Sequence, residues 1–440
     1  MTRVVVGFDD IDSEWGGCTT HLTGLFLYHI RSKVRLLDYP LLVRLNPNIP
    51  WKTRGNAATA LHLDYYGDPR ELYELAVWMV EEYTRDRDDW DVKRPGVIVY
   101  PGDPHSNPRL IWLYHKALRD VITVDIVRSI LDKSQALYHG GRGIIGATAG
   151  IGALGVGEDY TFELIAYRRP EMVGKERCLF EDEAIRIESL APTCTFNNVD
   201  WLTGRLAAAP RGPDPVLAGF RGDCPDMLKA YRRVLCEEPS FWVLYRSNQH
   251  TDPHDSLLTG ELTIYNTGTL KARITGWPRV ISGGHVVVRA STDWGEDVDI
   301  IFYRETNPLP RIGRLLVPGD EVRALGGVKP YTHNGVKTFA VEKLWVDKVA
   351  TLYKTMSPRC PRCGSRMKSA GTGKGYKCPK CGYTDKNARS IKIRLSRELI
   401  PGVYTPKEGR LGHLVMPRWR SKRTNSKINP PDINNVFILE

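Results

Sequence analysis

The spacing of apolar and polar residues changes several times along the chain and divides it into four regions. In the first region, residues 1–157, short apolar runs alternate with stretches whose apolar residues recur at helical spacing. Strands are predicted over Val4–Phe8 and Val97–Tyr100, and helices over His21–Ile30, Pro69–Tyr83 and Val121–Tyr138. This alternation predicts an α/β domain.

The second region, residues 158–256, has a different order of elements. In sequence they are a strand Tyr160–Tyr167, a helix Glu181–Glu188, strands Arg205–Ala209 and Val216–Arg221, a helix Pro225–Cys236 and a strand Phe241–Arg246. The order β-α-β-β-α-β is typical of a ferredoxin-like domain.

The third region, residues 257–350, contains short strand-like runs that glycine or proline mostly separates. They are Leu258–Tyr265, Val280–Arg289, Val298–Tyr303, Glu321–Leu325 and Thr338–Trp345. This pattern favours a small barrel, for which we predict an OB-fold that binds nucleic acid; an SH3-like barrel is the alternative.

The fourth region, residues 351–440, carries two Cys-Pro-x-Cys-Gly segments and a basic tail. The paired cysteines are Cys360, Cys363, Cys378 and Cys381. Two such pairs form a closed thiolate shell in zinc ribbons, so we predict a structural Zn²⁺; rubredoxin-type iron is the alternative. Basic residues that we expect to face phosphates are Arg362, Arg366, Lys368, Lys374, Lys377 and Lys380 in the ribbon and Arg418, Arg420, Lys422 and Arg423 in the tail.

Composition narrows the class of protein. Of 440 residues, 42% are apolar and 26% charged, as in folded multidomain proteins. No apolar run reaches the roughly 18 residues of a spanning helix and no signal sequence is evident, so we expect a cytoplasmic protein. The sequence gives no sign of an obligate protein partner. A net charge of +11 favours nucleic acid as partner, although a solvated basic surface gives the same count. The remaining cysteines are expected to be reduced and packed: Cys18, Cys178, Cys194, Cys224 and Cys236.

Three carboxylates follow the first predicted strand. Asp9, Asp10 and Asp12 would repel one another unless a cation neutralises them, and Mg²⁺ carrying phosphates is the cation that such oxygen ligands suit. Thr19 and Thr20 then stand at a predicted helix start, where free backbone amides favour phosphate. The alternative is a solvated turn, because Asp, Ser and Gly all favour turns.

Two further segments have residues suited to phosphate. The loop from Asn46 to Asn56 contains Lys52 and Arg54 beside glycine, a combination that binds transferring phosphates, although polar loops are often only solvated. Gly141 to Gly146 matches GxGxxG, but a helix-like stretch precedes it where a Rossmann fold needs a strand. Its glycines allow either close approach of the backbone to a ligand or close packing of a helix.

The whole chain resembles the archaeal tRNA(Ile) 2-agmatinylcytidine synthetase family, also called tRNA agmatidine synthetases. The resemblance rests on GFDDIDS followed by GGCTT, then RLNPNIPWKTRGNAA, GRGIIGA, TFNNVDW, GPDPVLAGFRG and SNQHTDPH in order, and on the carboxy-terminal zinc ribbon. Ile11 stands where the family pattern more often has threonine.

The resemblance implies an ATP-dependent carbon–nitrogen ligase with a kinase-like first domain. Such an enzyme uses ATP and Mg²⁺ to phosphorylate the C2 carbonyl oxygen of the wobble cytidine of an isoleucine tRNA, and then replaces that oxygen with agmatine. The product, 2-agmatinylcytidine, reads AUA codons. The wobble base has to leave the anticodon stack, and the barrel and ribbon would bind the tRNA.

The resemblance also assigns roles to residues of this chain. Asp9, Asp10 and Asp12 would act in catalysis and bind Mg²⁺, Lys52 and Arg54 would bind phosphates, and Thr19 matches an autophosphorylated threonine. Residues expected to bind ATP are Gly16, Gly17, Cys18, Thr20, Thr53, Gly55, Asn56, Gly141, Arg142 and Gly143. Candidates for agmatine are Asp200, Asp214 and Asp252.

Two other classes of function fit parts of the sequence. A barrel and a zinc ribbon can make a tRNA-binding protein without catalysis, and the acidic strand end can belong to a small-molecule kinase or phosphatase with an accessory RNA module. ATP turnover separates the first alternative from the ligase, and activity without tRNA separates the second.

Overall fold

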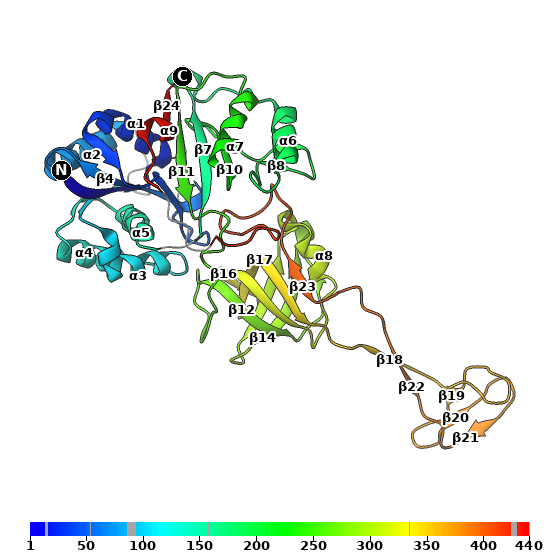
Figure 1. The fold of residues 1–440 in the computed structure, drawn as a ribbon. Coiled ribbons are helices and arrows are strands. Elements are labelled where there is room, and N and C mark those ends of the chain that lie inside the picture. The colour runs from blue at the N-terminus through cyan, green and yellow to red at the C-terminus, as the bar shows by residue number, and fades with distance from the viewer. Residues whose placement is uncertain are drawn as a thin grey trace.

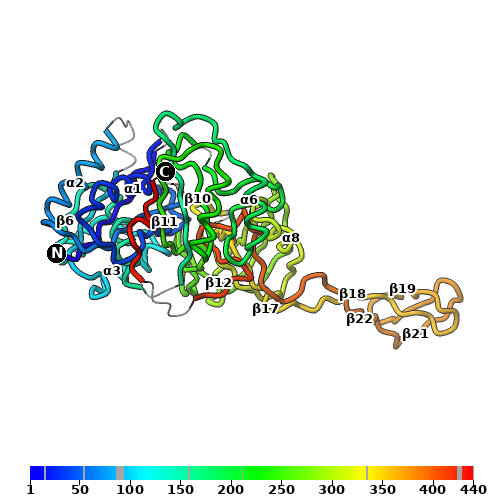
Figure 2. Tube along the Cα trace, turned by 45° about the horizontal axis from the view of Figure 1, so that its top comes forward, coloured from blue at the N-terminus to red at the C-terminus, as the bar shows by residue number. Residues whose placement is uncertain are grey.

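The computed structural model shows three bodies joined in series: a large sheet covered by helices, a barrel, and a small ribbon on a stalk (Figures 1 and 2). The structure describes residues 1–13, 16–52, 54–85, 94–156, 159–210, 212–333, 335–423 and 429–439. No helix in these ranges is long and apolar enough to cross a membrane.

The large sheet has the strand order β10-β7-β11-β3-β4-β1-β5-β6, with β2 beside β4 and β24 beside β11. Its strands are β1 (Thr2–Asp9), β2 (Val34–Leu36), β3 (Leu41–Arg44), β4 (Ala57–Tyr65), β5 (Gly96–Pro101), β6 (Leu137–Gly140), β7 (Thr161–Tyr167), β10 (Val216–Gly222), β11 (Phe241–Ser247) and β24 (Phe437–Leu439). Neighbours pair antiparallel except β11 and β3, which pair parallel. The first and second sequence regions therefore share one continuous sheet.

Helices cover both faces of the first half of this sheet. One core contains Val4, Val6 and Phe8 of β1 with α1 (Thr19–Ile30) and α2 (Pro69–Tyr83). The opposite core contains Val5 of β1 with the other three helices. These are α3 (Pro108–Ala117), α4 (Val124–Lys133) and α5 (Ile144–Leu154). Alternation along β1 thus puts this strand at the centre of the layers.

The second half of the sheet carries α6 (Glu181–Leu190) and α7 (Pro225–Leu228), the latter continued by a 3₁₀ turn. The prediction of a strand over 205–209 is wrong, because the strand that forms is shorter and pairs with a different neighbour. Only β9 (Arg205–Leu206) forms there, and it pairs with β8 (Val199–Asp200) rather than with the large sheet.

Five strands of the third region close into a barrel in the order β12-β14-β15-β17-β16 and back to β12. They are β12 (Thr267–Ile274), β14 (Val286–Thr292), β15 (Asp297–Phe302), β16 (Glu321–His333) and β17 (Val336–Lys348); β13 (Arg279–Val280) and α8 (Leu309–Gly313) flank them. The strand predicted over 258–265 is wrong, since the first barrel strand starts at Thr267. Its pairing with β16 decides the register, which local apolar spacing does not show.

The ribbon projects away from the barrel on a two-stranded stalk, β18 (Tyr353–Met356) with β22 (Ile391–Arg394) (Figure 1). It contains three short antiparallel strands, β19 (Lys368–Ser369), β20 (Tyr376–Lys377) and β21 (Thr384–Asp385).

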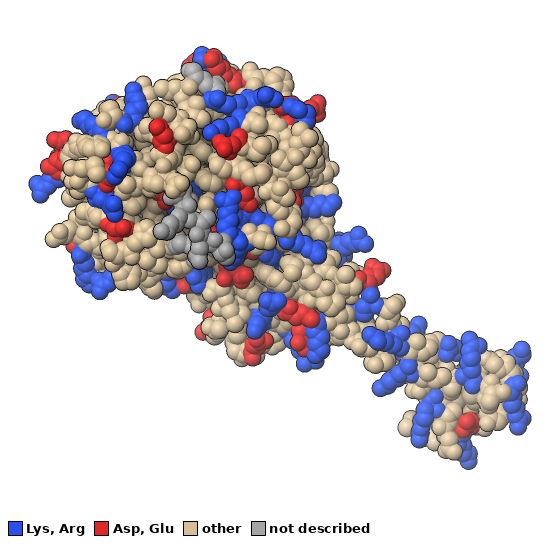
Figure 3. All heavy atoms as spheres, in the orientation of Figure 1, with Lys and Arg blue, Asp and Glu red and all other residues tan. Residues whose placement is uncertain are grey.

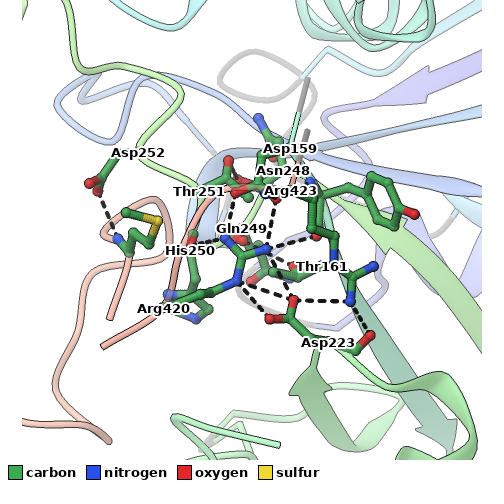
Figure 4. A network of polar contacts seen from close by, with 12 residues as sticks. Asp159, Thr161, Asp223, Asn248, Gln249, His250, Thr251, Asp252, Arg420 and Arg423 are labelled. Carbon is green, nitrogen blue, oxygen red and sulfur yellow. Dashed lines mark hydrogen bonds and ion pairs between the residues drawn. The ribbon is translucent and has the colours of Figure 1, made fainter. Parts of the chain in front are cut away.

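The chain then returns from the stalk to the body. β23 (Gly402–Tyr404) pairs with β17, and α9 (Ile433–Val436) and β24 lie against β11. Arg420 lies between β23 and α9 in the sequence and is only 4% exposed. Its guanidinium donates hydrogen bonds to the carboxylates of both Asp159 and Asp223 (Figure 4). The prediction that Arg420 presents a basic face is therefore wrong, because two carboxylates bury it.

The cysteine prediction is also partly wrong. Cys178 is bonded to Cys236 and Cys194 to Cys224, whereas Cys18 is free and buried as expected. Disulfides are rare inside most cells, which is why the sequence predicts reduced cysteines, but intracellular proteins of hyperthermophiles are an exception to that rule.

Candidate functional site

The functional site forms where β1 ends. Burial of β1 on both sides carries Asp9 into the interior, and Asp10 takes a left-handed backbone, φ 61°, that turns the chain. Asp9, Asp10 and Asp12 are 8%, 4% and 5% exposed. The predicted acidic cluster is therefore buried rather than a solvated turn.

Burial disfavours the charged forms of two carboxylates in the cluster. Burial, reinforced by the charge of Asp10, raises the pKa of Asp9 well above its ordinary value. Burial also raises the pKa of Asp10, although Arg142 opposes that shift with an ion pair of 3.1 Å. Buried carboxylates in this state suit a divalent cation.

The glycine-rich segment packs directly against the cluster. It leads from β6 into α5, so the expectation that a helix precedes Gly141 is wrong. A Cβ on Gly146 would lie 1.8 Å from Oδ2 of Asp9, and one on Gly143 would lie 2.7 Å from the Asp9 carbonyl oxygen. These glycines therefore allow α5 to begin beside the acids.

A first cavity of about 90 Å³, the Lys52 cavity, opens beside Asp9 and Asp10. Its polar lining includes Lys52, Asn56, Asp120, Arg142 and the Gly143 backbone, and its apolar lining includes Leu45, Ile49, Trp51, Val121, Ile122 and Ile145. Burial lowers the pKa of Lys52. The cavity is smaller than the roughly 300–1,000 Å³ of pockets that enclose a whole small molecule, so it suits one part of a nucleotide, with apolar surface for a base beside cations for phosphates.

The loop that supplies Lys52 is tied to the barrel. Asn46 donates from Nδ2 to the Tyr265 carbonyl at 2.9 Å and accepts from Thr267 Oγ1 at 2.7 Å. Asn48 donates to the Val328 carbonyl at 2.6 Å. The amides of this motif therefore position the loop, and the barrel holds one wall of the cavity.

A second cavity of about 270 Å³, the Thr19 cavity, lies beside Asp12. Thr19 Oγ1 donates to Asp12 Oδ2 at 3.2 Å and accepts from the Ile11 amide at 3.3 Å. Other polar residues in the lining are Thr20, Arg44, Gly55, Glu163, Asp214, Arg221 and His413. The three acids thus divide between two neighbouring cavities.

The remaining residues predicted to bind ATP do not all meet at the Lys52 cavity. Gly16 and Gly17 line a separate cavity of about 560 Å³ with His21 and Tyr83. Cys18 is buried, which raises the pKa of its thiol well above the ordinary value. Thr53 and the Arg54 side chain lie outside the described residues, and the Gly141 side of the segment packs on Arg94.

The three agmatine candidates lie in different surroundings. Asp214 lines the Thr19 cavity. Asp200 forms an ion pair with Arg410 at 3.0 Å, and Asp252 forms one with Lys343 at 2.5 Å and accepts from the Met416 amide at 2.7 Å. Asp200 therefore anchors the returning segment to the short β8–β9 pair, and Asp252 ties the loop after β11 to the barrel and the returning segment.

Sequence reasoning missed Arg44, Glu163, Arg221 and His413 in the Thr19 cavity. Arg44 and Arg221 belong to two of the quoted motifs, and Glu163 is a charged residue inside an apolar strand run, Thr161–Tyr167. Membership of a motif, or a charge within an apolar strand, could therefore have identified these three residues. His413 comes from the returning segment, and nothing local in the sequence places it at the site.

The four ribbon cysteines converge as predicted, with sulfur atoms within 4.8 Å of one another. Gly364 and Gly382 adopt φ of 71° and 74° and donate to the Cys360 and Cys378 carbonyls. Four thiolates at this spacing fit a tetrahedral Zn²⁺, with a structural role.

Family profiles match three parts of the chain. They are the TiaS TCKD domain over residues 5–68, the TiaS FLD domain over residues 141–254 and the TiaS C-terminal zinc ribbon domain over residues 357–399.

Curated relatives and solved structures match almost the whole chain. The tRNA(Ile) 2-agmatinylcytidine synthetase TiaS of Acidilobus saccharovorans is 49% identical, over 93% of this chain and 92% of the relative. The protein of that name from Staphylothermus marinus is 39% identical, over 94% and 93%. The crystal structure of TiaS in complex with its isoleucine tRNA and ATP aligns with a TM-score of 0.86 and 32% identity over 98% of this chain and 100% of that one. A complex of TiaS with the same tRNA, AMPCPP and agmatine gives a TM-score of 0.83 and 30% identity over 98% and 100%.

Proposed function

The chain belongs to the TiaS family of tRNA(Ile) 2-agmatinylcytidine synthetases, and we propose that it joins agmatine to C2 of the wobble cytidine of an isoleucine tRNA using ATP. The observation that carries this proposal is the division of the β1 acids between two adjoining cavities. One cavity suits part of a nucleotide, and the other suits a cation that reacts with an activated base.

ATP is assigned to the Lys52 cavity. Its apolar lining suits a purine, and Lys52, Arg142 and the amides that start α5 suit phosphates. Asp9, Asp10 and Asp12 would hold Mg²⁺, because all three are buried oxygen ligands and burial opposes the ionisation of Asp9 and Asp10. When bound, Mg²⁺ would neutralise part of the negative charge on the phosphates of ATP.

Asp12 and Thr19 lie together in the lining of the Thr19 cavity. Their 3.2 Å hydrogen bond lets the Asp12 carboxylate accept the Thr19 hydroxyl proton when the oxygen attacks the γ-phosphorus of ATP. The P–O bond to the rest of the nucleotide then breaks, and the nucleotide leaves with the electron pair. The threonine can then carry phosphate, as the family resemblance implies. The adjoining position of the Thr19 cavity makes that group accessible to a base bound there.

Agmatine is assigned to the Thr19 cavity beside Asp214. A buried carboxylate suits the guanidinium or ammonium end of agmatine, and Asp214 is 5% exposed. Asp200 and Asp252 already have cationic partners, so we propose that they act by holding the wall that includes His413.

Binding of tRNA is assigned to the barrel and ribbon. The barrel order β12-β14-β15-β17-β16, with β15 and β17 parallel, supports an OB-fold. Lys and Arg gather over the ribbon and stalk in Figure 3, which suits contact with phosphates. Zn²⁺ in the four-cysteine cluster would keep that surface folded.

We also propose a division of the chain into four domains. They are a kinase-like catalytic domain 1–157, a ferredoxin-like domain 158–256, an OB-fold 257–350 and a zinc ribbon with its tail 351–440. The order β10-β7-β11 with α6 and α7 supports the second, whose remaining strand is the short β9. The cytoplasmic location stays a prediction.

Labelled agmatine, ATP and a transcript of isoleucine tRNA test the proposal. Label should enter the tRNA only when ATP is present, and Asp10→Asn should abolish transfer while tRNA binding persists. Binding of tRNA without ATP turnover would favour the non-catalytic protein instead. Phosphoryl transfer that needs no tRNA would favour the small-molecule kinase or phosphatase.

A further inference from the structure

Two buried arginines share one carboxylate in the wall of the Thr19 cavity. Arg44 ends β3, Arg221 lies on β10, and Glu163 lies on β7 between them. Arg44 Nη2 is 3.5 Å from Glu163 Oε2, and Arg221 Nε is 3.3 Å from Glu163 Oε1. The arginine side chains are 11% exposed and the glutamate side chain 3%.

The group formed by Arg44, Arg221 and Glu163 contains two positive charges and one negative charge. Burial opposes ionisation of Glu163, but the charges of Arg221 and Arg44 outweigh it and hold its pKa below the ordinary value. His250 and His413 pack nearby but add no charge, because burial lowers the pKa of His250 to about 3 and that of His413 well below its ordinary value. Asp12 and Asp214 also line the cavity, which therefore offers both signs of charge.

The arginines also have unused donors. Nε of Arg44 is buried without a hydrogen-bond partner among the described residues, and Nε of Arg221, although it lies 3.3 Å from Glu163 Oε1, makes no hydrogen bond with it. Leaving buried charged donors unsatisfied is costly, so such groups indicate a ligand that completes them.

Two glycines make room for the arrangement. A Cβ on Gly55 would lie 2.3 Å from Arg44 Nη1, and a Cβ on Gly219 would lie 2.5 Å from Glu163 Oε1. Gly55, at φ 65°, belongs to the loop that also carries Lys52. The backbone therefore leaves space for this ion group at both ends.

We propose that Arg44 and Arg221 form an anion subsite for the phosphoryl group on the activated cytidine, with Glu163 as their positioning residue. This inference rests on the proposed function. The agmatine nitrogen bonds to C2 and the C2–O bond breaks, with its electron pair leaving on the oxygen of inorganic phosphate. The proton released by the nitrogen passes to a carboxylate of the same cavity. The arginines stabilise the departing charge.

Titration with inorganic phosphate tests the subsite directly. AMPCPP first saturates the Lys52 cavity, and calorimetry then follows phosphate binding to the full chain. Arg221→Gln should weaken binding about 10- to 100-fold, as expected for charged hydrogen bonds. The matched control is Arg246→Gln, since Arg246 is 12% exposed and pairs with Asp38. It should leave phosphate affinity unchanged.

Glu163→Gln should change the affinity for phosphate in the opposite direction to Arg221→Gln. It removes the competing carboxylate, so phosphate should bind more tightly and raise the melting temperature more than in the wild type. Damage to the fold would weaken phosphate binding in both Glu163→Gln and Arg221→Gln. Equal phosphate affinity in the wild type and Arg221→Gln would overturn the subsite.

Kinetics separate this inference from the proposed function. Arg221→Gln should lower kcat for agmatine transfer about 10²- to 10³-fold while KM for agmatine changes little. If the wild type transfers no agmatine, the proposed function fails, whatever the phosphate titration shows. If the wild type and Arg221→Gln transfer it equally well, only the anion subsite fails.

Discussion

Some arginine side chains in the body that carries the cavities have an environment opposite to that of the lysines and arginines in the zinc ribbon. In the ribbon, Arg362, Lys368 and Lys380 are exposed. In the body, Arg420 and Arg44 are buried against carboxylates. The net charge of the chain therefore has two sources. The exposed cations of the ribbon are available to a polyanion, whereas buried arginines of the body form ion pairs with carboxylates in the interior.

The two regions also differ in what stabilises them. The body contains large apolar cores on both faces of its sheet. The ribbon core comprises Cys360, Met367 and Cys378 with three partly buried neighbours, Cys363, Tyr376 and Tyr383. Bound metal should consequently matter for the ribbon and hardly at all for the body.

Metal removal is the change that should separate the regions most. Structural Zn²⁺ contributes about 10–16 kcal/mol in ribbon-sized peptides, so a chelator or Cys363→Ser should unfold residues 357–399 alone. Hydrogen exchange checks this: β19–β21 should lose protection and β1 should keep it. Loss of protection in both regions, or in neither, would contradict the comparison.

Arg420→Gln should have the next largest effect. It leaves the Asp159 and Asp223 carboxylates without their shared partner, and breaking a buried pair costs about 3–5 kcal/mol. The free energy of unfolding in urea measures this cost. The matched control Arg418→Gln changes an exposed residue two positions away and should stay within about 0.5 kcal/mol. Equal losses in the two variants would show that Arg420 has no special role.

Arg418 and Arg420 also show how far sequence reasoning can reach. Nothing local distinguishes them; Arg420 is buried because Asp159 and Asp223 approach from distant segments. Strand β1, helix α2 and the cysteine cluster were predictable, since their signals lie within short stretches of chain.

Long-range pairing explains the elements that were predicted wrongly. Residues 121–138 divide into α4 and β6 because residues 137–140 pair with β5. At the site, the acids and Lys52 were predictable from residue type. The division into two cavities and the contribution of His413 were not, because they depend on how the barrel and the returning segment pack.

Disulfides should contribute less than Arg420 to the body. Replacing both Cys178 and Cys236 by serine should cost about 2–4 kcal/mol, because the unfolded chain regains freedom. Urea unfolding measures the loss. Alkylation of unfolded, unreduced wild-type protein supplies the control, and modification of every cysteine would contradict the pairing.

The smallest expected effect is a pH dependence that Glu188 gives the body. Burial raises its pKa from 4.5 to about 7, so the folded state binds this proton more tightly than the unfolded state. The resulting stability is complete below pH 4.5 and is lost as the pH rises through 7. Glu188→Gln should flatten the unfolding free energy between about pH 5 and 7 by on the order of 1–2 kcal/mol. Glu171→Gln, at an exposed site, should leave the slope unchanged.

The most direct test concerns Thr19, which lines the Thr19 cavity beside Asp12. With ATP labelled at the γ-phosphate, agmatine and isoleucine tRNA, formation of 2-agmatinylcytidine and label on the protein are measured for Thr19→Ser and Thr19→Val. Thr19→Ser keeps the hydroxyl that donates to Asp12 and should retain both signals, whereas Thr19→Val should lose both while still binding AMPCPP. Product formation by Thr19→Val at the wild-type rate would contradict this role of the Thr19 hydroxyl.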